Sequence, residues 1–151
     1  MPQGDGTSAN PYQIANAAQL AWFRDWVNGT YTPAEGETAT QHRTACAKLT
    51  ADIDMSTVCS ESIGSWQFIS PFQDGVRWSG TFDGDGHTIS DISVSWDSYG
   101  FAGLFGIISG ATVKNLTISK SSFYAGFGVA AIAGAAFKST ISNCHTTGSV
   151  K

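Results

Sequence analysis

The chain of 151 residues lies within the usual size range of one domain, and no run of it approaches the roughly 18 apolar residues of a membrane span. Its net charge of −4 comes without the clustered Lys and Arg that a nucleic-acid partner would require. Hydrophobic residues make up 42% of the chain, charged residues 13%, and there are 17 glycines, a balance that favours β structure with many tight turns over helices.

One amphipathic helix is predicted near the N-terminus, over residues 16–28. Asn16-Ala17-Ala18-Gln19 has the pattern of a capping box, whose side chains bond the free backbone N–H groups at a helix start, and Gly29 is suited to end the helix. Apolar residues recur on one face at helical spacing, namely Leu20, Phe23 and Val27. A stack of β-strands leaves unpaired edges at its end, so we expect this helix to cap the N-terminal end of the β structure.

Residues 30–46 follow as a surface loop that contains Pro, Gly and many Thr. Strands are predicted over three segments, residues 48–54, 65–69 and 76–82. With the repeats described below, residues 48–151 form the β region of a single domain that spans residues 1–151. The first residues lack the charged and apolar regions of a signal peptide, and we expect the domain to be a piece of a larger protein.

The three cysteines are Cys46, Cys59 and Cys144, and the chain contains no Cys-x-x-Cys of the kind that binds zinc. The better interpretation for Cys46 and Cys59 is a disulfide, which would close a loop around the first strand in an extracellular setting. Free thiols are the alternative, and Cys144 is expected to be a buried thiol.

An internal repeat is the strongest signal in the sequence. Three seven-residue segments align, Thr88–Val94, Thr112–Ile118 and Thr140–Thr146, offset by 24 and 28 residues. In each, apolar residues flank a polar pair that ends in Asp or Asn, and these two residue types tolerate the left-handed backbone of a sharp bend. A repeat of this length with β-branched segments is typical of a β-solenoid, in which equivalent residues stack in ladders.

The repeat alignment predicts which side chains line the core in stacked rows. The inward residues alternate with outward ones, as the two-residue period of a strand requires. The predicted core residues are Ile89, Ile92, Val94, Val113, Leu116, Ile118, Ile141 and Cys144.

Gly103-Leu104-Phe105-Gly106, followed by the segment 109–116, resembles the GLUG motif, a repeat of large bacterial surface and secreted proteins. The likeness extends to the N-terminal segment 4–14, to Leu49–Asp54 and to the turn within Gly80–Ile89. In the next repeat, the corresponding Ala131-Ile132-Ala133-Gly134 departs from the motif.

The resemblance implies a mainly β fold, a short right-handed parallel β-helix of the pectate-lyase type with an N-terminal capping helix. It also implies an extracellular location, secreted or at the cell surface, and a role as an adhesion module or scaffold. Similar repeats accompany some immunoglobulin A-specific metallopeptidases, but this chain has no His-Glu-x-x-His zinc motif.

Asp83-Gly84-Asp85-Gly86 is a candidate calcium loop, because alternating carboxylates around glycine resemble part of an oxygen-ligand loop. The downstream bidentate Glu of such loops is missing. A turn whose glycines require positive φ explains the same motif, and it is the preferred interpretation.

Two sets of residues are candidates for ligand binding. A ladder of outward threonines could bind carbohydrate or ice, although Thr also suits any exposed strand position; its members are Thr88, Thr112 and Thr140. Large aromatic residues could form a platform for sugar rings, or could pack over the core instead; these are Trp66, Trp78, Trp96 and Tyr99.

A polysaccharide lyase or glycoside hydrolase on a β-helix is the alternative function, and it requires clustered carboxylates with a base. The candidates are Asp52, Asp54, Asp83, Asp85 and Asp91, with Arg77 as the nearby arginine. Their spacing matches no lyase pattern, so the sequence predicts a non-catalytic scaffold or adhesion module without metal or cofactor. Its expected partners are a host or matrix glycan or protein. At an open C-terminal end we expect either end-to-end association with a second copy or a continuation of the solenoid.

Overall fold

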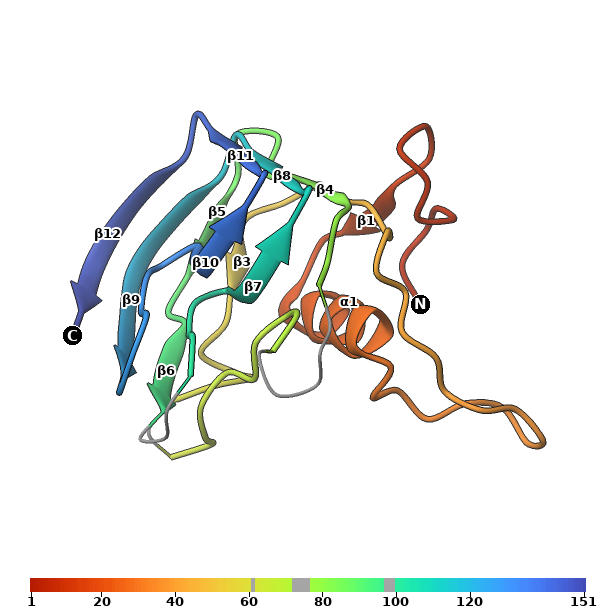
Figure 1. The fold of residues 1–151 in the computed structure, drawn as a ribbon, viewed down its shortest axis with the longest axis horizontal. Helices are drawn as coiled ribbons and strands as arrows, with labels where there is room; N and C mark the ends of the chain where they lie inside the picture. The colour runs from red at the N-terminus through yellow and green to blue at the C-terminus, as the bar shows by residue number, and fades with distance from the viewer. Residues whose placement is uncertain (61, 72–76, 97–99) are drawn as a thin grey trace.

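The computed structural model describes residues 1–60, 62–71, 77–96 and 100–151 (Figure 1). Within them the chain is mainly β, with one helix. The elements in chain order are β1 (Tyr12–Ile14), α1 (Ala17–Asn28), β2 (Ala47–Leu49), β3 (Ile53–Asp54), β4 (Thr81–Asp83), β5 (Thr88–Ser90), β6 (Ser93–Trp96), β7 (Phe105–Ser109), β8 (Thr112–Lys114), β9 (Thr117–Ala125), β10 (Ala133–Phe137), β11 (Thr140–Ser142) and β12 (His145–Val150).

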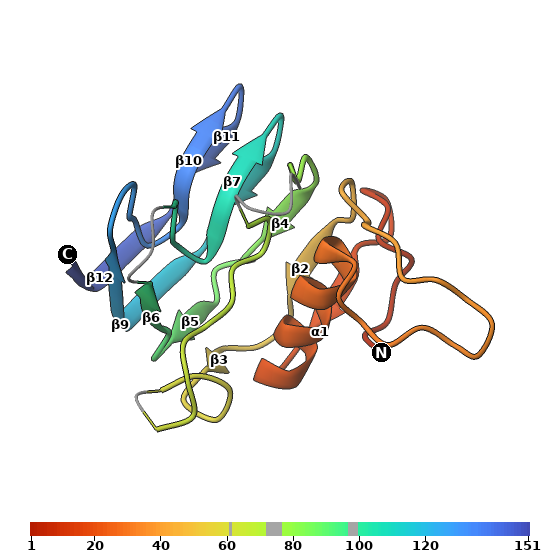
Figure 2. The ribbon, with the colours of Figure 1, turned by 60° about the horizontal axis from the view of Figure 1, so that its bottom comes forward.

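These strands form three sheets in which every described strand pair is parallel. The first sheet has the order β1-β2-β4-β8-β11, the second β12-β9-β5-β3 with β6 also on β9, and the third is the pair β10-β7. Strands β7, β8 and β9 thus belong to three different sheets, and β10, β11 and β12 repeat the same order beside them (Figure 2). The expectation of a mainly β chain with parallel strands is confirmed.

Helix α1 forms where the capping box predicts it. The Asn16 side chain accepts a hydrogen bond from the Gln19 backbone N–H at 2.9 Å, and Gln19 Oε1 accepts one from Ala15 N–H at 2.7 Å. Gly29 ends the helix with a φ of 73°, in the left-handed region that glycine adopts without strain. The predicted inner face, Leu20, Phe23 and Val27, is fully buried. The helix lies at the β1 end of the molecule, opposite β12 (Figure 1).

The predicted bends are present. Asp91, Asn115 and Asn143 have φ values of 60°, 54° and 50°, as the repeat pattern requires. The side chains at one bend also stack, because Asn143 Nδ2 donates to Asn115 Oδ1 at 2.9 Å and Asn115 Nδ2 donates to Asp83 Oδ1 at 3.1 Å. These side-chain hydrogen bonds link the residue after β11, the residue after β8 and the end of β4, which are adjacent strands of the first sheet.

The alignment of the first repeat with the second is wrong. Thr112–Lys114 does pair with Thr140–Ser142, at the predicted offset of 28 residues. Thr88, however, lies opposite Thr117, where β5 pairs with β9 in the second sheet. The residue opposite Thr112 is Thr81, where β4 pairs with β8. Asp91 therefore belongs to a different bend from Asn115. The two bends share the same apolar and polar order, so the pattern alone could not tell them apart.

The early strands also differ from the expectation. The predicted strand over residues 48–54 is two short strands, β2 and β3, separated by a bend. Residues 65–69 form no strand and contribute a single bridge, between Ile69 and Phe105. Of the segment 76–82, Val76 lies outside the described residues, and the strand begins at Thr81. Residues 30–46 form no helix or strand, as predicted.

The core is continuous and most of its predicted members are buried. In the first sheet the inward row runs Tyr12, Ala47, Phe82, Val113 and Ile141. The first four of these are buried, but Ile141 is 43% exposed because no strand covers β11 on its outer side. Cys144 is half-buried and packs against the core. The core prediction is therefore wrong for Ile141, and the expectation that Cys144 is a buried thiol is wrong.

The predicted disulfide is not formed, and all three cysteines are free thiols. Cys46 Sγ contacts Thr44 O and accepts from Thr81 N–H, whereas Cys59 Sγ contacts Met55 O and accepts from Ser93 N–H. Each thiol is therefore held by its own neighbouring backbone, in a different part of the stack. Sequence proximity around one strand did not bring the two sulfurs together, because the chain bends between β2 and β3.

We expect three thiols per chain to react with a disulfide reagent when the protein is denatured without reduction. In the folded protein half-buried Cys144 should react first. Cys59 should react slowest, because burial raises the pKa of its thiol and keeps it from forming the reactive thiolate. Titration with the reagent before and after denaturation measures both, and a single thiol per denatured chain would contradict the assignment.

Candidate functional site

The predicted threonine ladder is not one ladder. Thr81, Thr112 and Thr140 stack across the first sheet, whereas Thr88 stacks on Thr117 in the second. Thr140 is exposed and the others are half-buried. The result is two short and separate rows, which offer less flat surface than the continuous face that a ladder site needs.

The three aromatic candidates that the structure describes, Trp66, Trp78 and Trp96, do not form a platform. Trp78 is fully buried, stacks on Phe105 at 4.7 Å between ring centroids and donates its indole N–H to Ala45 O. Trp66 is also buried, with its indole N–H on Leu104 O. Tyr99 lies outside the described residues. Trp96 lines a hollow of the surface.

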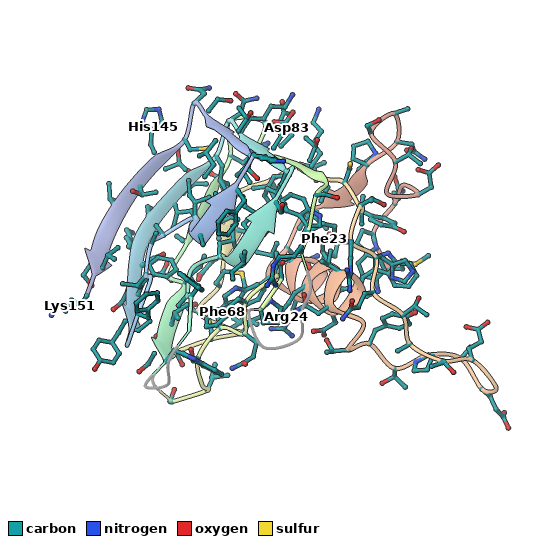
Figure 3. The ribbon with its side chains drawn as sticks, in the orientation of Figure 1. Phe23, Arg24, Phe68, Asp83, His145 and Lys151 are labelled. Atoms are coloured by element: carbon teal, nitrogen blue, oxygen red, sulfur yellow. The ribbon has the colours of Figure 1, made fainter. Side chains whose placement is uncertain are left out.

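That hollow, here called the Arg24–Trp96 cavity, has a volume of about 360 Å³. It lies where the second half of α1 meets the segment 65–71 and the end of β6. Figure 3 shows Arg24 and Phe68 side by side at this junction. The side chains that give it its chemical character are Arg24, Asp25, Asn28, Gln67, Phe68 and Trp96.

An ion pair forms the helix side of the cavity. Arg24 donates to both carboxylate oxygens of Asp25, from Nε at 2.8 Å and from a terminal nitrogen at 3.3 Å. The guanidinium also lies 4.8 Å from the ring centroid of Trp66, a cation–π contact that fixes its plane. Thr30 adds a hydroxyl hydrogen bond to Asp25 at 3.1 Å.

Asn28 holds the opposite wall in place. Its side chain is buried, donates to Phe68 O at 2.8 Å and accepts from Ser70 N–H at 2.8 Å. Phe68 in turn packs edge-to-face on Trp96, with 5.4 Å between ring centroids. The indole Nε1–H of Trp96 is buried without a hydrogen-bond partner among the described residues. The cavity thus joins a charged pair, amides and two aromatic rings on a packed support.

A second and wider hollow, of about 570 Å³, lies on the outer side of the helix and is lined in part by Trp26, Gln41 and His42. Here Trp26 is sandwiched between Trp22 at 5.3 Å and His42 at 3.6 Å. Both faces of its ring are therefore occupied by the protein. This stack fastens the loop 30–46 to α1, since His42 N–H also donates to Val27 O.

The candidate calcium loop is a turn tied by ion pairs. Asp83 pairs with Lys114 at 3.8 Å and Asp85 with Lys48 at 3.3 Å. Gly86 has positive φ, as the interpretation as a Gly-rich turn predicts, but Gly84 does not, and the other residue of the turn with positive φ is Asp85. Over residues 1–60, 62–71, 77–96 and 100–151, no group of three or more His, Cys, Asp or Glu side chains is placed to hold a metal ion.

The carboxyl groups near this turn are stabilised as anions. The N–H of Thr88 and the His87 ring keep the pKa of Asp52 below its usual value. Partial burial raises the pKa of Asp83, but hydrogen bonds from Asp85 N–H and Asn115, with Lys114 and Lys48 nearby, outweigh it and hold that pKa low. A general acid needs a raised pKa, so neither group is tuned for that role.

Sequence reasoning found Trp96 but missed the other side chains of the cavity. Arg24, Asp25 and Asn28 lie off the apolar stripe of the helix, where polar residues are ordinary. The one available signal was Asn28, a polar residue one position after Val27 at the helix end, and its burial depends on the distant segment 65–71.

Comparison with known proteins gives two relatives by sequence. Over 97% of this chain, the sequence is 32% identical to halomucin of Haloquadratum walsbyi. Over 77% of this chain, it is 27% identical to a candidate Gly-rich membrane protein of Evansella cellulosilytica. It spans only 2% of the first protein and 12% of the second. No protein-family model matches the chain.

Among solved structures, a candidate immunoglobulin A1 protease from Bacteroides ovatus is similar, with a TM-score of 0.71 and 24% identity. The match covers 97% of this chain and 40% of that one, and at this identity it bears on the fold alone. In the described part of this chain, no helix is long and apolar enough to cross a membrane.

Proposed function

We propose that this chain is a non-catalytic scaffold or adhesion module of a secreted or cell-surface protein, built as a short right-handed β-helix of GLUG type with α1 as its cap. The observation that carries the proposal is the repeated order of β7, β8, β9 and β10, β11, β12 across three parallel sheets. Parallel strands joined by crossovers are right-handed in nearly all proteins, which favours the proposed hand.

The relatives support the proposed location. One is named as a membrane protein and the other as halomucin, and this chain matches a small part of each. A module that forms a minor part of much longer proteins is well suited to a structural or adhesive role.

The arrangement of acidic groups favours a scaffold over a polysaccharide-cleaving enzyme. Asp52, Asp83 and Asp85 each pair with a different basic side chain at the corners of the stack. Cleavage of a glycoside requires two carboxyl groups of unlike pKa facing one bond. Asp52 and Asp83 instead have pKa values shifted in the same direction, downward.

Incubation of the chain with a panel of polysaccharides tests the absence of catalysis. Glycan binding without the release of new chain ends is the expected result. Release of reducing or unsaturated ends would contradict the proposal and favour the enzyme.

The proposal also predicts association through the C-terminal end. Strands β10, β11 and β12 each lie at the outer edge of their sheet, and inward-facing Ile141 and Val150 are 43% and 51% exposed. Open edges with uncovered core residues tend to pair with another chain or with further strands. We therefore expect concentrated samples to associate through this face.

Thr146→Lys should weaken that association, because Thr146 stacks on buried Ile118 and its substitution places a charge on the uncovered core row. His145→Lys is the matched control, since His145 is the neighbouring residue and lies on the other face of the strand. Sedimentation velocity over a range of concentrations measures both. A wild-type chain that stays monomeric, or equal effects of the two variants, would contradict association through this edge.

A further inference from the structure

We propose that the Arg24–Trp96 cavity binds a neutral saccharide, an assignment that rests on the proposed role as a binding module. Its volume of about 360 Å³ lies at the lower end of the range of small-molecule sites and suits one end of an oligosaccharide. The cavity also combines apolar rings with a small number of polar groups, which is the usual composition of such sites.

The charges of the wall favour an uncharged ligand. Arg24 and Asp25 neutralise each other, and their side chains are only 18% and 33% exposed. A cation would meet the guanidinium, and an anion would meet the carboxylate. A carboxylate ligand normally binds Arg through two parallel N–H groups, and here Asp25 already occupies Nε and one terminal nitrogen.

The unused polar capacity of the wall matches hydroxyl groups. A guanidinium has five N–H donors, and Arg24 uses two of them on Asp25. A carboxylate accepts about four hydrogen bonds, and Asp25 accepts three, two from Arg24 and one from Thr30. Exposed Gln67 adds an amide whose only bond within the described part of the chain is a long one from Nε2 to Ser65 O. Spare donors and acceptors thus lie side by side, and neighbouring sugar hydroxyls both donate and accept.

The aromatic wall supplies the apolar side of the site. Phe68 is buried and packs edge-to-face on half-buried Trp96, so Trp96 supplies the ring surface against which the C–H face of a sugar ring can pack.

Binding of the whole chain to an array of neutral and acidic oligosaccharides, followed by calorimetric titration, tests the assignment. We expect a neutral saccharide to bind. Asp25→Asn should weaken it about tenfold, because a charged hydrogen-bond partner is lost, and Gln67→Ala about threefold. Gln41→Ala, which changes an amide of the wider hollow, is the matched control and should leave binding unchanged.

Three outcomes would overturn the site: no neutral saccharide binds, both variants bind as the wild type does, or a zwitterionic dipeptide competes for the bound sugar. If Asp25→Asn fails to fold, Gln67→Ala decides alone, because Gln67 is exposed. Failure of the site leaves the scaffold proposal intact. Conversely, cleavage of the bound saccharide would overturn the non-catalytic proposal while the site remained.

Discussion

Replacement of Leu116 by alanine should lower the free energy of unfolding by about 2–5 kcal/mol, the range for removing a large apolar side chain from a core. Leu116 is 1% exposed and lies directly after the Asn115 bend, between β8 and β9. Its carbonyl accepts from His145 N–H at 2.9 Å, so the backbone there is held by the next pass of the chain. The neighbouring strands therefore cannot close the cavity that the substitution leaves.

Thr117→Ala is the matched control, one position along the chain and on the outward side. Thr117 is half-buried and its side chain makes no hydrogen bond within the described part of the chain, so the change should stay within about 0.5 kcal/mol. Urea titration of both variants gives the comparison. Equal losses of stability would mean that the assignment of inward and outward positions is wrong.

Features that depend on a few adjacent residues were predictable from the sequence. The helix was found at its observed limits, because its cap, its apolar stripe and its terminal glycine all lie within Asn16–Gly29. The left-handed bends at Asp91, Asn115 and Asn143 were found for the same reason, since only a few residue types tolerate that backbone conformation.

The register of the first pass was not predictable in this way. Thr88-Ile89-Ser90 and Thr140-Ile141-Ser142 are identical in sequence, yet the first pairs in the second sheet and the second in the first sheet. The two segments hold different places in the fold, because Thr88–Ser90 is β5 and pairs with β9, whereas Thr140–Ser142 is β11 and pairs with β8. Local similarity therefore selected the wrong partner.

The Arg24–Trp96 cavity depends on segments far apart in the chain. Asn28 and Phe68 are joined across 40 residues, and Phe68 meets Trp96 across a further 28. Trp96 was a candidate only as a large aromatic residue, Asn28 stands out only as a polar residue beside the apolar stripe, and Phe68 belongs to no motif. From the sequence, the polar residues of α1 are expected to be solvent-exposed. Asn28 is buried only because the segment 65–71 packs against the helix.

Gly84→Ala should destabilise the fold by about 3 kcal/mol, the upper part of the usual range for overpacking. A Cβ at this position would lie 2.3 Å from Asn115 O and 2.7 Å from Leu116 Cα, both backbone atoms of the next pass. Gly84 N–H donates to Lys114 O at 2.8 Å, so the two backbones are already bonded at this closest approach. A methyl group fits only if β4 and β8 move apart.

Gly86→Asn is the matched control in the same turn. Gly86 has a φ of 80°, but nothing lies within 4 Å of its Cβ position, and Asn tolerates the left-handed region better than other residues. We therefore expect a loss of about 1 kcal/mol or less for Gly86→Asn. Thermal and urea unfolding of the two variants distinguish close approach from backbone conformation as the reason for each glycine. If Gly86→Asn proved the more damaging change, the turn would be held by its dihedral angles, and the contact of Gly84 with the Asn115 bend would contribute little to stability.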